Sequence, residues 1–146
     1  MDTEIEIKIV RAFCEKIFQS RFIYELSGRK RSNFIRKLCH RYRRYLKADC
    51  ILDECKQFPA FEVCEQKMRL NSGHRECYVI SEYPDFDGIY TDWVTAYDKL
   101  GINGFASITV GLPSGFAHFK AESYASFQPN CFLKPKNRFD GLPWDI

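Results

Sequence analysis

Residues 105–122, "FASITVGLPSGFAHFKAE", decide the fold class of this chain. Two apolar runs, 105–111 and 116–122, flank "LPSG", whose proline and glycine are typical of a tight turn. Residues 101–119 carry no charge and are long enough to suggest a membrane span, but they contain four glycines, a proline and several hydroxyl groups. The pattern therefore predicts a β-hairpin.

Further strands are expected on both sides of this hairpin. The run "ECYVIS" (76–81) is typical of a buried strand, and "NCFLK" (130–134) predicts another. Between the first of these and the hairpin, "EYPDFDG" (82–88) indicates an acidic turn. Thr91 or Asp92 is then placed to cap a short helix that ends near Leu100.

The N-terminal half has helical periodicity instead. Thr3 and Glu6 match a capping box, and apolar residues then recur at helical spacing as far as Leu26. "SG" at 27–28 ends this helix, a second is predicted to run to about residue 48, and a third from Pro59 to Leu70. We therefore predict one α+β domain over 1–146, helical to about residue 72, with a mostly antiparallel sheet over 73–146.

Composition narrows the class of protein. The chain has 146 residues, 45% of them hydrophobic, which is enough to bury a core without metal or disulfide. Its start lacks the pattern of a signal peptide, and its seven cysteines are an odd number, so reduced thiols in the cytoplasm are expected. We predict a cytoplasmic protein without a membrane segment.

Charge is concentrated in one segment. Residues 29–47 hold nine of the 22 lysines and arginines and no acid, which leaves 13 cations against all 19 acids elsewhere. On a helix, the aromatic and aliphatic residues of this segment share an arc of about 140°. Arg31 alone among the cations falls on the apolar side. The predicted binding residues occupy the opposite side: Arg29, Lys30, Arg36, Lys37, Arg41, Arg43, Arg44 and Lys47.

Three interpretations of this basic side are open. Like-charged neighbours at helical spacing cost about 0.2–0.5 kcal/mol per pair, so something acidic is expected to offset them. It could be the protein's own carboxylates, an acidic protein partner, or a nucleic acid backbone. The sequence has no helix-turn-helix, zinc-finger or RNA-binding signature, so a protein partner is favoured over nucleic acid.

Metal and catalytic motifs are incomplete. Four cysteines and one histidine have the donor atoms for zinc but lack paired ligand spacing, namely Cys50, Cys55, Cys64, Cys77 and His74. "DFDG" (85–88) lacks the later ligands of a calcium loop, and Ser114 in "GLPSG" is one place late for a nucleophile elbow. We predict no essential metal, no cofactor and no catalytic residue. A small enzyme that uses His74, His118 or Cys77 remains the second alternative.

Three segments resemble small bacterial proteins of uncharacterised families. They are 21–40, 77–88 and 104–123, about half of the chain, and the likeness lies in apolar spacing and turn residues. The resemblance implies a compact α+β domain and brings no activity or site residue with it. Taken together, the sequence favours a non-catalytic binding protein that uses a basic helix face.

Overall fold

The computed structural model of the protein describes residues 1–72, 76–101, 104–123 and 127–139. Within these ranges the chain begins with three α-helices and ends with three strands, with helices and strands mixed between them. The α-helices are α1 (Thr3–Phe13), α2 (Lys16–Leu26), α3 (Arg31–Tyr45), α4 (Phe61–Ser72) and α5 (Trp93–Gly101), and the 3-10 helices are η1 (Ala48–Cys50) and η2 (Pro84–Phe86). The strands are β1 (Ile51–Cys55), β2 (Glu76–Ser81), β3 (Ile89–Asp92), β4 (Ser107–Gly111), β5 (Ala117–Lys120) and β6 (Asn130–Leu133).

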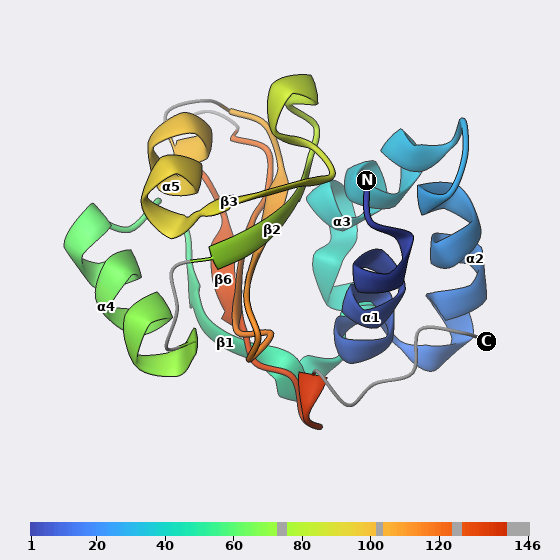
Figure 1. The fold of residues 1–146 in the computed structure, drawn as a ribbon, viewed down its shortest axis with the longest axis horizontal. Helices are drawn as coiled ribbons and strands as arrows, with labels where there is room; N and C mark the ends of the chain where they lie inside the picture. The colour runs from blue at the N-terminus through green and yellow to red at the C-terminus, as the bar shows by residue number, and fades with distance from the viewer. Residues whose placement is uncertain (73–75, 102–103, 124–126, 140–146) are drawn as a thin grey trace.

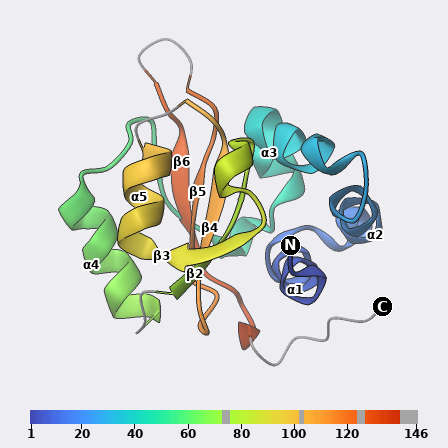
Figure 2. The ribbon, with the colours of Figure 1, turned by 45° about the horizontal axis from the view of Figure 1, so that its top comes forward.

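These six strands form one sheet with helices on both faces. Their order is β1-β6-β5-β4-β2-β3, and each neighbouring pair is antiparallel. Helices α1, α2 and α3 lie on one face, and α4 and α5 lie on the other (Figure 1, Figure 2). The predicted α+β class is confirmed.

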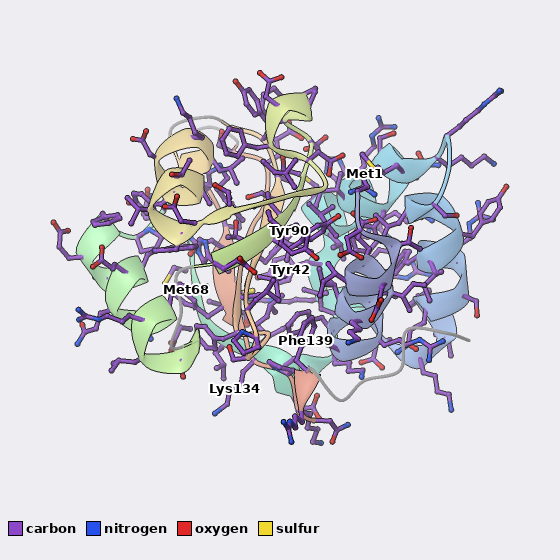
Figure 3. All side chains as sticks on the ribbon, viewed as in Figure 1. Met1, Tyr42, Met68, Tyr90, Lys134 and Phe139 are labelled. Atoms are coloured by element: carbon purple, nitrogen blue, oxygen red, sulfur yellow. The ribbon has the colours of Figure 1, made fainter. Side chains whose placement is uncertain are left out.

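Helices on both faces of the sheet explain why the central strands are buried throughout. Every residue of β4 and β5 is buried, because a strand between two helical layers has no solvent face. Phe119 belongs to the larger core against α1–α3, and Phe132 packs with Met68 on the α4 and α5 side. Figure 3 shows Tyr42 and Met68 on opposite sides of the sheet.

The hairpin at 105–122 forms as predicted. β4 and β5 pair from Ser107 with Lys120 to Val110 with Ala117. Gly115 closes the turn with φ of +83°, and a Cβ at this position would lie 2.5 Å from the Phe139 ring. Both the backbone conformation and the neighbouring ring therefore require glycine here.

The structure also confirms the strands expected at 76–81 and 130–134 and the helix near 59–70. Asp92 caps α5 as expected, because its carboxylate accepts from the Thr95 N–H at 2.8 Å.

The long first helix of the prediction is wrong, because α1 and α2 are separate. α1 begins after Asp2, whose carboxylate accepts from the Ile5 N–H at 3.2 Å, so Asp2 and not Thr3 is the N-cap. Cys14 then forms an isolated antiparallel bridge with Leu46, the residue after α3. The backbone leaves the helix in order to make this long-range pairing, which local periodicity does not encode.

Two strands were missed. β1 lies inside the segment predicted as helical and pairs with β6, while β3 follows the acidic turn and pairs with β2. Both stand at the edges of the sheet, and β1 is mostly exposed. The β1 register also shifts between Leu52 and Cys55, with Asp53 at φ of +50°. An exposed, irregular edge strand lacks the alternation by which strands are predicted.

Candidate binding surface on helix α3

Helix α3 packs against the rest of the protein through its apolar face. Phe34, Ile35 and Leu38 are buried, and the Phe34 ring meets the Phe22 ring of α2 edge-on at 5.1 Å. Helical geometry breaks at Arg41, where φ is −148° and ψ is 49°. The prediction of one regular helix to about residue 48 is therefore wrong in two respects: α3 is bent at Arg41 and ends at Tyr45.

Arg31, the one cation predicted on the apolar side of the helix, binds two carboxylates of the protein itself. The Arg31 guanidinium donates to both Glu6 carboxylate oxygens at 2.6 Å and to both Asp87 oxygens at 2.8 and 2.9 Å. The Tyr78 hydroxyl donates to the same Glu6 carboxylate at 2.6 Å. Burial alone would lower the Arg31 pKa, but the bonds to Glu6 and Asp87 raise it overall. This network joins α1, α3 and the turn after β2.

Three of the eight predicted binding residues have internal partners. Lys37 donates to the fully buried Glu25 carboxylate at 2.7 Å. Arg43 lies 2.7 Å from a Glu54 carboxylate oxygen, and Lys47 donates to a backbone carbonyl of α1 at 2.9 Å. The protein's own groups therefore satisfy part of the basic face, as the first of the three interpretations expected.

The other five are exposed and project from the same helix and the turn before it. Among the described residues, no carboxylate oxygen lies within 4.0 Å of their charged nitrogens. The Arg44 guanidinium carbon lies over the Tyr45 ring, 5.6 Å from its centre, in a cation–π contact. We call this set the basic surface; it consists of Arg29, Lys30, Arg36, Arg41 and Arg44.

Two hollows adjoin the bent part of α3. The smaller, about 320 Å³, is lined by residues that include Arg36, His40 and Tyr45. The larger, about 800 Å³, is a groove between α3, β1 and the segment after β5, and Arg41 borders both. We refer to the larger hollow as the α3 groove. Its lining residues are Cys39, His40, Arg41, Tyr42, Arg43, Glu54, Cys55, Lys56, Ala121, Glu122, Ser123 and Pro129.

The α3 groove contains a short hydrogen-bond chain that sequence analysis did not identify. The Tyr42 hydroxyl donates to Glu54 at 2.5 Å, and the Arg43 Nε donates to the same carboxylate oxygen at 2.8 Å. Burial, followed by the hydrogen bond to Glu54, raises the pKa of Tyr42 to about 12. Glu54 comes from the missed edge strand β1, so no local pattern connects it with α3.

Two of the three residues that the sequence offered for catalysis, His118 and Cys77, lie on the other side of the sheet from this surface. His118 is buried on the α4 and α5 side, where its ring nitrogen lies 3.1 Å from the Asn130 side-chain oxygen. Cys77 is fully buried, and burial raises its pKa to about 12. His40 is exposed on α3, and His74 lies outside the described residues. Two buried groups, one of them a poor nucleophile at neutral pH, give no support to the Cys/His enzyme alternative.

The cysteines considered as zinc ligands are distributed through the fold. All seven cysteines are free thiols and five are buried. Cys64 and Cys77 share the α4 and α5 core, Cys50 donates to a carbonyl of α1, and Cys55 is exposed on β1.

The "DFDG" segment forms part of η2 and the turn after it, and Asp87 binds Arg31. Ser114 lies in the hairpin turn, where its hydroxyl accepts from the Phe116 N–H.

Fold and surface together define an α+β protein that presents an unneutralised basic surface beside a groove. Comparison of the chain with family models, with curated proteins and with solved structures found no match. Across the described ranges, no helix is both long and apolar enough to cross a membrane.

Proposed function

We propose that this is a non-catalytic binding protein whose basic surface contacts an acidic region of a protein partner. The observation that carries the proposal is that the protein's own groups pair with some of the predicted binding cations and not with others. Lys37 and Arg43 have carboxylate partners and Lys47 a carbonyl partner, whereas no described carboxylate pairs with the five cations of the basic surface. A complementary acidic surface would supply the missing countercharge and speed encounter.

The basic surface stands on a helix that is packed against the core, and this supports recognition of a partner over simple solvation. Arg36 precedes the bend at Arg41, where Phe34 and Leu38 anchor α3 in the main core, and Arg44 follows the bend, where Tyr45 packs against that core. Charges in fixed register lose less conformational entropy on binding than charges on a loose tail. The basic surface therefore suits a partner with a matching arrangement of carboxylates.

A mixed distribution of charge beside the basic surface favours a protein over a nucleic acid. Glu54 and Glu122 line the α3 groove together with Arg41, so a phosphate backbone that entered this groove would meet carboxylates of its own sign. Proteins can match alternating signs over short distances, whereas a nucleic acid presents one sign throughout. Nucleic acid binding through the same surface is the alternative, and the experiment below distinguishes the two.

We expect the triple variant Arg29→Glu, Arg36→Glu and Arg44→Glu to lose partner binding by at least about tenfold while it keeps its fold, because surface changes cost little stability. A control variant with the same net charge reverses exposed cations elsewhere: Lys16→Glu, Arg69→Glu and Lys134→Glu. Proteins recovered from lysate by wild type are identified, and the affinity of the purified partner is measured for each variant.

Three outcomes separate the possibilities. Loss in the triple variant alone, with no binding to duplex or single-stranded nucleic acid, supports the proposal. Generic nucleic acid binding by wild type, with log affinity falling linearly against log salt, supports the alternative. If the triple variant folds normally and retains every interaction of the wild type, the basic surface is only solvated and both are wrong.

A further inference from the structure

A thiol and two carboxylates from three separate elements come together beside the α3 groove. Cys39 lies on α3, Glu82 directly follows β2, and Glu122 lies two residues after β5. The Cys39 Sγ is 3.8 Å from a Glu82 carboxylate oxygen and 3.7 Å from a Glu122 carboxylate oxygen. All three donor atoms lie within 4.8 Å of one another.

These separations are close to those of a tetrahedral metal site. With Zn–S near 2.3 Å and Zn–O near 2.0 Å, tetrahedral angles place sulfur and oxygen roughly 3.5 Å apart. The two S–O distances here exceed that value by only a few tenths of an ångström. The two carboxylate oxygens lie within 4.8 Å of each other, and they would have to come to roughly 3.3 Å by side-chain rotation to hold one ion.

Charge at the cluster also favours a cation. Among the described residues, no lysine or arginine nitrogen lies within 4.0 Å of the Glu82 or Glu122 carboxylate. Cys39 and Glu82 are partly buried, and two carboxylates facing one thiol repel each other unless a proton or a metal ion lies between them.

Backbone groups hold two of the donors in place. The Glu122 N–H donates to the Cys39 Sγ at 3.1 Å, and the Ala106 N–H donates to the Glu82 oxygen at 3.2 Å. Hydrogen bonds of this kind orient metal ligands and stabilise a thiolate. Without a metal, burial and the nearby carboxylates raise the pKa of Cys39 to about 12, although the Glu122 N–H opposes this. The thiol is then protonated at neutral pH.

We propose that Cys39, Glu82 and Glu122 bind a divalent transition metal ion of the zinc class. On binding, the Cys39 S–H bond breaks, the thiolate and one oxygen of each carboxylate become ligands, and one proton is released to solvent. Cys39 and Glu122 line the α3 groove, so the fourth coordination position is open to water or to a donor atom of a bound molecule. The site does not depend on the basic surface or its proposed partner.

The experiment uses the full chain, freed of metal by chelation and kept reduced without added thiols, and titrates it with Zn²⁺ and with Co²⁺. We expect one equivalent of each metal to bind, a thiolate-to-cobalt charge-transfer band, and one proton released per ion. Affinity should fall as the pH is lowered, because the thiol must lose its proton. Bound Zn²⁺ should also raise the melting temperature.

Matched variants locate the site. Cys39→Ser should abolish the charge-transfer band and weaken Zn²⁺ binding by more than the roughly 10–100-fold that loss of an outer-shell partner costs. Glu82→Gln and Glu122→Gln should weaken it as well. Cys55→Ser, an exposed thiol in the same groove, should leave both readouts unchanged. The proposal is wrong if wild type binds no stoichiometric metal, or if Cys39→Ser binds Zn²⁺ and Co²⁺ as wild type does.

Discussion

Replacing Arg31 with alanine is expected to lower the free energy of unfolding by about 3–5 kcal/mol, the cost of breaking a buried ion pair from one side. The buried Glu6 carboxylate on α1 would then have, among the described residues, the Tyr78 hydroxyl as its remaining side-chain donor. Asp87 would lose both of its guanidinium bonds. The penalty comes from the desolvated carboxylate that is left behind more than from the lost attraction.

Denaturant unfolding of the two proteins at neutral pH measures this difference. Arg44→Ala is the matched control, because it removes the same side chain from the exposed face of the same helix, and it should change the free energy by no more than about 0.5 kcal/mol. Equal effects of the two substitutions would show that the Arg31 network does not stabilise the fold.

His118 is expected to make the protein less stable in mild acid. Burial lowers its pKa from 6.5 to about 4, and the hydrogen bond to Asn130 only partly opposes this. Between these two pH values the unfolded chain binds a proton that the folded chain does not. The neutral ring is therefore stabilising above pH 6.5, and that stability is lost as the pH falls toward about 4. At about 1.4 kcal/mol per pH unit, the total loss is about 3 kcal/mol.

Free energies of unfolding measured at intervals from neutral pH to pH 4 test this, with His118→Gln as the comparison. The carboxylates common to both proteins contribute equally, so the difference between the two pH profiles isolates the histidine. A His118→Gln profile parallel to that of wild type would contradict the prediction.

Prediction from the sequence succeeded where one residue's neighbours along the chain decide its environment. The β4–β5 hairpin has its turn residues and both apolar runs within eighteen positions, and α3 shows in its own periodicity which face is buried. It failed at the join of α1 and α2 and at edge strand β1. In both places the conformation is set by pairing with a distant segment, Leu46 in the first case and β6 in the second.

The candidate sites divide in the same way. The sequence by itself determined that residues 29–47 carry cations and no acids, and helical spacing separates most of these cations from an apolar face as far as the bend at Arg41. Only the tertiary structure decided which cations are neutralised, because Glu25 and Glu54 reach α3 from other elements. It also decided that Cys39 meets Glu82 and Glu122, which lie 43 and 83 positions further along the chain. Ion pairing and metal binding depend on distances of a few ångströms, and those distances exist only once the layers have packed.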